Sequence, residues 1–516
     1  MSRPGSSPRR TAPSALTSRR FAPEPRSPPA RRRRIASTPC THPAKASSAT
    51  GRSSRSRERR PRRWRRRPRR PRRPPPPRRR PLRPPPDRPA GGVSRLANPS
   101  PGPQTALVQT VDIVVVGAGP AGAAAAITAA RGGLDVLVVD RARFPRDKCC
   151  GDGLTALALR ELEALGLDPT DVPSWCQVTE VVLHGPDDAR TALRLPDDGV
   201  HAAVARRADL DHALVALTRS VTEVREGTEV TAVSVDTAGI TVTADDGPVR
   251  ARTVIAADGM WSPVRRMVGA DPAPGYRGDW HAFRLYVVNV APPARDGLHV
   301  FFEKDLLPGY AWSFPLADGR ANVGFGVQRS DGGTGSLSGK ELARLGATLL
   351  DRPALRTVLG PDASPEGPVR AWPIPARFEH ATLDAADGRV LVVGDAATAT
   401  DPLTGEGIGQ ALLTGRLAAE AVLARPWDPP AAAAHYRRTA RSHLVADHRL
   451  ADLLIGPLRR PGGVRLTLRA VDTCDWTRRN FARWMFEDYP RALLATPRRW
   501  HRGMLRPPGA YRNTAG

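Results

Sequence analysis

Cysteine is scarce in this chain of 516 residues, which holds five: Cys40, Cys149, Cys150, Cys176 and Cys474. Their odd number and unpaired spacing argue against a disulfide framework and against a zinc site, so no metal is expected. Long apolar runs are missing as well. Without a run of about 18 apolar residues, no segment is expected to span a membrane. These absences are typical of a reduced, cytoplasmic protein.

Acidic residues are nearly absent from the first 110 residues, which hold three of the 51 Asp and Glu residues but 31 of the 79 Lys and Arg residues. Residues 111–516 therefore carry 48 of each sign, and the formal charge of +28 belongs to the first segment. That segment is rich in Arg, Pro and Ser and has almost no apolar periodicity. We therefore predict a disordered tail over residues 1–108.

Three interpretations of this tail stay open. It is an arm for nucleic acid or anionic lipid, a targeting peptide, or an extension that precedes the true start codon. The last is favoured because Met1 is the only methionine before Met260, and the folded pattern begins abruptly near Val111. On that interpretation the tail has no part in the function, and no specific nucleic-acid partner is expected.

The passage VDIVVVGAGPAGAAAAITAARGGLDVLVVD has the order strand, glycine turn, helix, strand and acid. Gly117 allows a tight turn, Gly119 lets the backbone approach a pyrophosphate, and Gly122 lets helix and strand pack closely. The helix N-terminus offers free N–H groups to phosphate. Asp140 lies 18 residues after Gly122, where a partner for a ribose hydroxyl is expected. The passage predicts a dinucleotide site.

Two later passages each place an acid at the carboxyl end of a predicted strand, where open α/β sheets bind ligands. TVIAADG ends at Asp258-Gly259, and RVLVVGD ends at Gly394-Asp395 before a loop and a long helix. These passages and RRADLD resemble motifs of the flavoprotein hydroxylase superfamily, related to p-hydroxybenzoate hydroxylase. The resemblance implies FAD as cofactor. It also implies further cofactor-binding residues: Arg207, Asp258, Gly259, Gly394, Asp395, Pro402, Gly405 and Gly407.

The loop FPRDKCCGDGL follows this unit and resembles the C-G-x-G loop of the geranylgeranyl reductase branch of the superfamily. YAWSFP resembles the Y-x-W-x-F-P element of the same reductases. The resemblance implies catalytic roles for Cys150, Tyr310 and Trp312. It implies substrate contacts from Gly151, Gly153, Tyr310, Trp312 and Phe314. Cys149 is an extra residue in this loop and receives no role.

Residues 310, 312 and 314 have period-two spacing, which places three aromatic side chains on one face of a strand. Such a row lines an apolar tunnel or fills a core. Residues 280–326 hold nine of the 26 aromatic residues, which favours the tunnel. For Cys150, packing as a small buried side chain is the alternative to a role in proton donation.

The resemblance implies an FAD-dependent reductase that hydrogenates C=C bonds of a geranylgeranyl or polyprenyl substrate, which is a diphosphate, a lipid or a quinone side chain. NAD(P)H or reduced ferredoxin would supply the electrons. The alternative is an FAD-dependent aromatic monooxygenase of the same fold. A halogenase is disfavoured because a W-x-W-x-I-P element is absent, and a non-enzymatic flavin-binding protein is the third class.

We predict an α/β fold in which a Rossmann-like FAD-binding domain combines with an antiparallel substrate sheet and C-terminal helices. The FAD domain is expected over residues 109–275 and 385–425, and the substrate sheet over 276–384. Residues 426–516 are expected to be helical. Because they mix arginine with aromatic residues, they are expected to cap the tunnel or to contact a membrane surface peripherally. The oligomeric state is not specified by the sequence.

Overall fold

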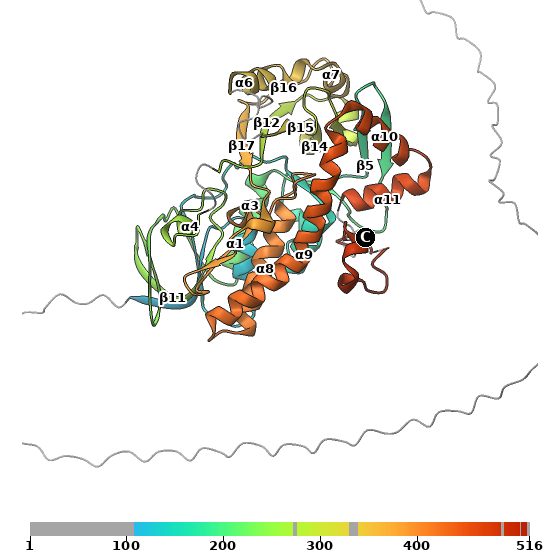
Figure 1. The fold of residues 1–516 in the computed structure, drawn as a ribbon. Helices are drawn as coiled ribbons and strands as arrows, with labels where there is room; N and C mark the ends of the chain where they lie inside the picture. Colours follow the sequence, from blue (N-terminus) through green and yellow to red (C-terminus); the bar gives the residue numbers. More distant parts are fainter. Residues whose placement is uncertain (1–107, 272–275, 330–338, 487–489, 506, 513–516) are drawn as a thin grey trace, which may run out of the picture. The chain divides into compact units, whose positions relative to one another are not determined.

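The computed structural model describes residues 108–271, 276–329, 339–486, 490–505 and 507–512 (Figure 1). Apart from Val108, the predicted disordered tail lies outside these residues. No helix within the described ranges is both long and apolar enough to cross a membrane.

The first sheet has the order β18-β19-β11-β1-β2-β8, with β10 and β9 continuing from β11. Its central strands are parallel, because β1 pairs in parallel with both β2 and β11. Val114 and Val115 in β1 are fully buried, as expected for a strand covered on both faces. The strands are β1 (Gln109–Val116), β2 (Val136–Asp140), β8 (Glu223–Glu226), β9 (Val230–Asp236), β10 (Gly239–Ala244), β11 (Gly247–Ala256), β18 (Asp384–Ala385) and β19 (Val390–Val392).

The second sheet has the order β16-β12-β15-β14-β13-β5-β6, with β17 beside β12. Its pairs are antiparallel except for β13 with β5, which run parallel. Its strands are β5 (Glu180–His184), β6 (Arg190–Arg194), β12 (Trp280–Val288), β13 (Leu298–Phe301), β14 (Tyr310–Leu316), β15 (Arg320–Gln328), β16 (Ser364–Pro365) and β17 (Arg370–Ile374). Because β5 and β6 belong to this sheet, residues 180–194 of the predicted FAD segment 109–275 build the substrate sheet instead.

A small third sheet, β3-β7-β4, lies in the first half of the chain. It consists of β3 (Gly153–Leu154), β4 (Cys176–Gln177) and β7 (Ala203–Val204). The helices up to residue 424 are α1 (Pro120–Arg131), α2 (Ala156–Leu165), α3 (Arg207–Arg219), α4 (Pro263–Met267), α5 (Pro292–Asp296), α6 (Gly339–Ala347), α7 (Pro353–Leu359) and α8 (Ile408–Ala424).

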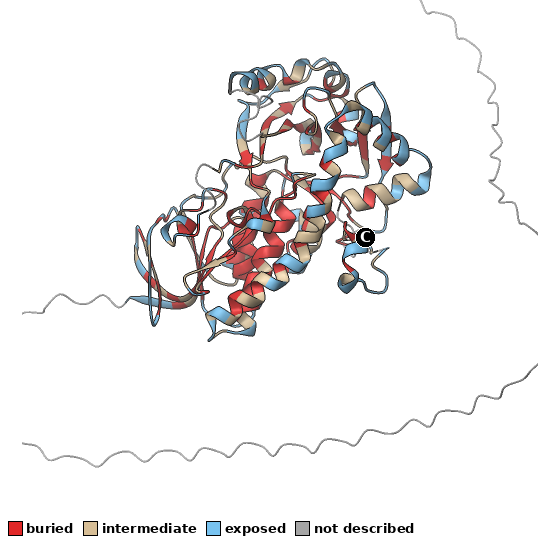
Figure 2. Ribbon diagram, viewed as in Figure 1, coloured by how far each residue is buried: buried red, intermediate tan, exposed pale blue. Residues whose placement is uncertain are grey.

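Small residues let α1 and α8 pack side by side against the first sheet (Figure 1). A Cβ on Gly415 of α8 would lie 2.0 Å from the carbonyl oxygen of Ala121, so only glycine fits at this crossing. The packed face is almost wholly buried (Figure 2). This crossing fixes the start of α1, where the predicted phosphate turn lies, against the middle of α8.

The C-terminal part is helical, with α9 (Pro429–Leu458), α10 (Pro461–Val471) and α11 (Asp475–Met485). Helix α9 runs beside α8, and the hydroxyl of Tyr436 donates a 2.8 Å hydrogen bond to the carbonyl oxygen of Val392 in β19. Helices α10 and α11 then pack on the β5–β6 end of the substrate sheet. The predicted fold class is confirmed for the described residues.

Candidate active site

A cavity of about 990 Å³ extends from the carboxyl ends of the first sheet to the substrate sheet. One end is lined by glycine turns and acidic side chains. The other end is lined by aliphatic and aromatic side chains of β5, β13, β14 and helices α9 to α11. The volume suits a large ligand, and the two ends differ in chemistry as a nucleotide and a hydrocarbon chain do.

The three glycines of the first turn meet different surroundings. Gly117 has a φ of +103°, and a Cβ there would lie 2.4 Å from the carbonyl oxygen of Ala257. A Cβ on Gly122 would lie 1.7 Å from the carbonyl oxygen of Gly117. A Cβ on Gly119 would approach only the Arg146 guanidinium, at 3.6 Å. Gly117 and Gly122 are thus required by protein packing, whereas Gly119 faces the cavity.

The start of α1 is open toward the cavity. Gly119 is its N-cap residue, and no side chain caps the helix. The carboxylate of Asp140 accepts hydrogen bonds from the backbone N–H groups of Ala118, at 2.7 Å, and Ala142, at 2.8 Å. Asp140 therefore holds the turn in shape and also lines the cavity. Uncapped helix N–H groups at a cavity wall favour a bound phosphate.

Arg207 lies at the start of α3 and is buried. Its Nε and Nη2 atoms donate to the two carboxylate oxygens of Asp211 at 2.8 and 2.7 Å. Arg146 adds a second contact, 3.2 Å from the Asp211 carboxylate. Both arginines line the cavity. The shared carboxylate fixes their positions, and two guanidinium groups on one carboxylate leave one net positive charge at the cavity wall.

Asp258 and Gly259 follow β11 at the cavity wall. The Asp258 carboxylate accepts from the Ser262 hydroxyl at 2.5 Å and from the backbone N–H of Val264 at 3.0 Å. Gly259 has a φ of +82°, and a Cβ there would meet no atom within 4 Å. Asp258 therefore organises the turn into α4, while Gly259 leaves the cavity clear.

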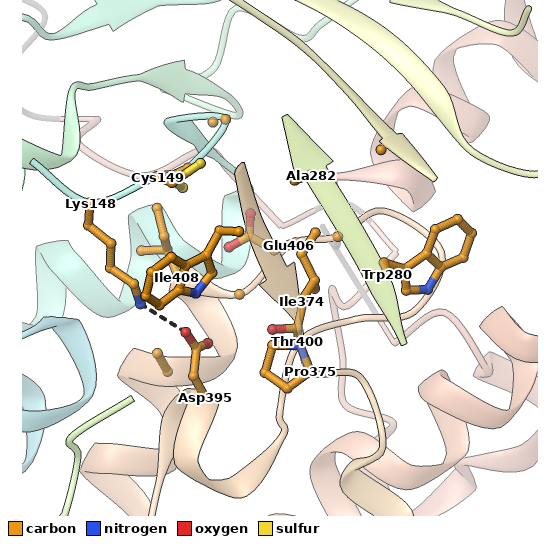
Figure 3. A pocket seen from close by; sticks show the side chains of 18 of the residues that line it. Lys148, Cys149, Trp280, Ala282, Ile374, Pro375, Asp395, Thr400, Glu406 and Ile408 are labelled. Atoms are coloured by element: carbon orange, nitrogen blue, oxygen red, sulfur yellow. Dashed lines mark hydrogen bonds and ion pairs between the residues drawn. The ribbon is translucent and has the colours of Figure 1, made fainter. Parts of the chain in front are cut away.

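Asp395, at the end of β19, pairs with Lys148 of the cysteine loop. Figure 3 shows the Lys148 ammonium reaching the Asp395 carboxylate, at 2.8 Å. Although burial opposes ionisation, the charge of Lys148 lowers the pKa of Asp395. The surrounding turn depends on Gly394, whose φ is +59°, and a Cβ on Gly407 would lie 3.8 Å from the Asp395 carboxylate. Pro402, Gly405 and Gly407 line the same stretch of cavity.

The loop at Cys150 is held by polar side chains of the substrate sheet. Asn322 in β15 donates to the carbonyl oxygen of Cys150 at 2.9 Å and to the carboxylate of Asp152 at 2.7 Å. The Tyr286 hydroxyl donates to the same carboxylate at 2.8 Å. Asp152 has a φ of +64°, and burial raises its pKa to about 6. These contacts fix the loop against the sheet.

The side chains of Tyr310, Trp312 and Phe314 all line the cavity, as a row on one face of β14. Ring centroids lie 6.2 Å apart for Tyr310 and Trp312, and 6.0 Å apart for Trp312 and Phe314. The Trp312 indole N–H donates to the side-chain oxygen of Asn322 at 3.0 Å. The Tyr310 hydroxyl donates to the carbonyl oxygen of Thr404. One asparagine therefore connects the row to the cysteine loop.

Gly151 and Gly153 lie directly under these rings. A Cβ on Gly151 would be 3.5 Å from the Phe314 ring, and one on Gly153 would be 3.2 Å from it. Glycine lets the loop backbone approach the rings closely. The predicted cofactor, catalytic and substrate residues, with the exception of Gly122 and Gly394, all line this one cavity. Gly122 and Gly394 serve the packing around it.

The two neighbouring thiols are both protonated at neutral pH. Burial raises the pKa of Cys149 to about 12, and it raises the pKa of Cys150, although the Arg207 charge opposes this rise. The Cys149 thiol lies 3.6 Å from the carbonyl oxygen of Arg370. Within the described ranges, no group of three His, Cys, Asp or Glu side chains could hold a metal ion.

The far end of the cavity is apolar. It is closed by the substrate sheet on one side and by the last helices on the other, through Leu454, Leu458, Leu468, Phe481, Trp484 and Met485. That the C-terminal region caps a substrate tunnel stays a prediction, and these are the side chains that would form the cap. A hydrocarbon chain would be surrounded by side chains that exclude water.

Sequence reasoning did not assign roles to Arg146, Lys148, Asp152 and Asn322. Three of them lie in the cysteine loop, where charged residues beside glycines were a visible signal. Asn322 is a polar residue within the predicted apolar strand RANVGFGV. A polar side chain that is fully buried in a strand needs a partner, and here the partners are the cysteine loop and Trp312.

The polar end of the cavity fits FAD. Gly119 leaves open space in front of an uncapped helix start, and Arg146 lies beside that space. Asp258 and Asp395 face the cavity at the ends of neighbouring strands β11 and β19. Such a cradle provides backbone N–H groups and positive charge for a pyrophosphate, and carboxylates for hydroxyl groups.

Comparison with known protein families gives a match over residues 110–414 to the family described as FAD binding domain. Menaquinone reductase of Mycobacterium tuberculosis is 35% identical over 399 residues, covering 70% of this chain and 88% of the relative. Digeranylgeranylglycerophospholipid reductase 2 of Methanopyrus kandleri is 33% identical over 324 residues, covering 60% of this chain and 76% of the relative.

Solved structures share the fold. A geranylgeranyl bacteriochlorophyll reductase-like protein from Thermoplasma acidophilum superposes with a TM-score of 0.62 at 23% identity, covering 75% of this chain and 98% of that chain. A probable FAD-dependent monooxygenase from Pseudomonas aeruginosa superposes with a TM-score of 0.55 at 21% identity, covering 69% of this chain and 99% of that chain. At these identities the two structures indicate a common fold only.

Proposed function

The chain belongs to the FAD binding domain family and is an FAD-dependent oxidoreductase, and on that premise we propose that it hydrogenates C=C bonds in a prenyl chain carried by a lipid. The prenyl side chain of a quinone is the first substrate to test, because a relative that aligns over 399 residues is named menaquinone reductase. A geranylgeranyl phospholipid is the second candidate. Geranylgeranyl diphosphate is the third.

One observation carries the proposal. The row of Tyr310, Trp312 and Phe314 faces the Cys150 loop, and both border the nucleotide cradle and the apolar end of one cavity. An aromatic ring to be hydroxylated would need a compact pocket with polar groups to orient it. An extended apolar space enclosed by a sheet and three helices suits a long hydrocarbon chain better.

The residues that would hold FAD are those of the polar end: Gly119 and Arg146 at the pyrophosphate, Asp140 at the ribose, and Asp395 with Lys148 further along. When bound and reduced, FAD supplies the hydride for the reaction. The chain supplies position and exclusion of water. Asn322 keeps the Cys150 loop and Trp312 in a fixed relation, so an alkene that lies against this wall would be held in one orientation.

A hydride added to one carbon of an alkene requires a proton at the other. Cys150 is a protonated thiol at the cavity wall, and the positive charge of Arg207 would stabilise the thiolate left after donation. We propose the Cys150 thiol as the proton donor. Asp152 holds the loop that carries it, through the Tyr286 and Asn322 hydrogen bonds.

The electron donor that reduces FAD is proposed to be NAD(P)H or reduced ferredoxin. The sequence contains one glycine-rich dinucleotide turn, at residues 117–122. NAD(P)H would therefore bind transiently rather than in a second Rossmann unit. Rapid-mixing measurements of flavin bleaching with each donor distinguish the two.

The test of the reaction uses the purified full chain with its flavin reduced chemically. A prenylated quinone, a geranylgeranyl phospholipid and geranylgeranyl diphosphate are each offered with and without oxygen, and product masses are recorded. The proposal expects a gain of two hydrogen atoms per reduced bond without oxygen. A gain of one oxygen atom on an aromatic substrate, only when oxygen is present, would instead establish the monooxygenase alternative.

A further inference from the structure

Exposed apolar side chains gather in the C-terminal helices. Of the twelve large hydrophobic side chains that are exposed in the described residues, six lie between residues 453 and 505. On α9, α10 and α11 these are Leu453, Leu466 and Trp476, which are 70%, 71% and 71% exposed. Scattered single exposures are normal on a protein surface, but a concentration in one short region marks an interaction surface.

The same helices line the apolar end of the cavity from their other faces. Leu454 neighbours Leu453, and Leu468 lies two residues after Leu466. Helix α10 packs on the β5–β6 hairpin, since a Cβ on Gly185 would be 2.8 Å from Leu468. Exposed stretches run along α10 and α11 (Figure 2). Only one layer of helix therefore separates the exposed apolar residues from the cavity.

The segment that carries these apolar residues, residues 453–485, is predominantly basic. Residues 453–485 contain seven arginines, two aspartates and no other charged residue, a net of five positive charges, whereas residues 111–516 as a whole are balanced. Arg465 pairs with Asp187, and Arg478 pairs with Asp472 and Asp475. The side chains of Arg459, Arg460, Arg469 and Arg479 are exposed beside the apolar residues.

We propose that α9, α10 and α11 form a docking surface for an anionic phospholipid bilayer, with Leu453, Leu466 and Trp476 entering the interface and the exposed arginines contacting lipid phosphates. Apolar and aromatic side chains flanked by arginine are the composition that binds the membrane interface. A second copy of this chain fits less well, because a twofold contact would bring together the exposed arginines of both copies: Arg459, Arg460, Arg469 and Arg479.

The docking surface also supplies a route for the substrate. A prenyl chain in the bilayer would pass between the last helices into the apolar cavity without crossing water. This route rests on the proposed function, whereas the docking does not. Pro457, in the last turn of α9, is exposed and also lines the cavity, so a single helical turn lies between the cavity and the surface at this place.

The first experiment measures whether Trp476 enters the bilayer. The full chain is mixed with vesicles of phosphatidylcholine and phosphatidylglycerol, at about three to one, whose acyl chains carry bromine. Bromine quenches tryptophans that enter the bilayer. We expect the quenched fraction to fall in Trp476→Leu and to stay unchanged in Trp427→Leu, a matched control at a tryptophan that is 77% exposed elsewhere. Equal quenching of both variants would overturn the proposal.

The second experiment measures affinity by flotation. Leu453→Ser/Leu466→Ser/Trp476→Ser is compared with Val235→Ser/Met267→Ser/Trp427→Ser, which removes exposed apolar side chains elsewhere. Both variants keep the arginine-rich first 107 residues, so the contribution of that segment cancels. We expect the partition coefficient of the first variant to fall at least about tenfold and that of the second to stay within about twofold.

Turnover measured with substrate in detergent and in vesicles distinguishes a failure of the proposed reaction from a failure of the docking surface. With substrate dispersed in detergent, the first variant should turn over like the wild type, and with substrate in vesicles it should be slower. Wild type that is inactive in both formats would refute the proposed reaction and leave the docking result intact. A first variant that floats like the wild type, or that changes from dimer to monomer instead, would refute the docking surface.

Discussion

The guanidinium of Arg491 lies 2.6 Å from the carboxylate of Asp401, and the two side chains are 2% and 1% exposed. Asp401 also accepts hydrogen bonds from the backbone N–H groups of Leu403 and Thr404, at 3.0 and 2.8 Å. It thereby shapes the loop that carries Pro402, Gly405 and Gly407. The last segment of the chain is thus tied to the loop proposed to hold the flavin.

Replacing Arg491 by methionine should destabilise the protein and weaken its hold on FAD. The variant leaves a buried carboxylate without its partner, which costs about 3–5 kcal/mol. In the wild type, burial raises the pKa of Asp401, but the charge of Arg491 outweighs burial and lowers this pKa to about 2. Thermal unfolding and flavin absorbance per chain measure both effects. Arg449→Met, at an exposed ion pair with Glu379, is the control and should change little. Equal losses in both variants would contradict the prediction.

The glycines of the first turn should respond differently to valine. Gly119→Val places its side chain in the open cavity, so we expect a folded protein that retains no FAD. Gly122→Val places a Cβ 1.7 Å from the carbonyl oxygen of Gly117, so we expect loss of folded protein. Circular dichroism and flavin absorbance separate the two results. A Gly119→Val protein that purifies with full flavin content would remove this residue from the pyrophosphate site.

Serine at position 150 should leave FAD binding intact and slow turnover. Loss of a proton donor lowers kcat by about 100-fold or more, whereas loss of a packing side chain would not. Cys149→Ser is the matched control at the adjacent thiol, and its kcat should stay near that of the wild type. Turnover at the full rate in the Cys150→Ser protein would return Cys150 to a packing role.

Asp152 should make stability depend on pH. Burial raises its pKa from an ordinary value of 3.8 to about 6 in the folded protein. A raised folded pKa gives stability that is present below about pH 4 and is lost as the pH rises through about 6, worth about 3 kcal/mol. Relative to Asp152→Asn, the wild type should therefore lose stability between pH 4 and 7. Parallel unfolding curves for the two proteins across this range would refute the shift.

The local sequence pattern was sufficient to predict the dinucleotide-binding unit. The order of strand, glycine turn and helix at 111–131 depends on contacts between near neighbours, such as the close approach of Gly117 and Gly122, and these are encoded in the residues themselves. Similarly, period-two spacing was enough to place Tyr310, Trp312 and Phe314 on one face of β14. The sequence by itself determined the FAD-binding fold, the family resemblance and the candidate residues.

Only the tertiary structure decided which of these residues meet. Lys148 and Asp395 are 247 positions apart, and Asn322 reaches Cys150 across 172 positions. The β5–β6 hairpin joins the substrate sheet through a parallel pairing with β13 that no local pattern encodes. Pairings at such distances depend on how whole sheets and helices pack. Periodicity along the chain does not record that packing. It therefore predicted which residues belong to the site, but not which of them contact one another.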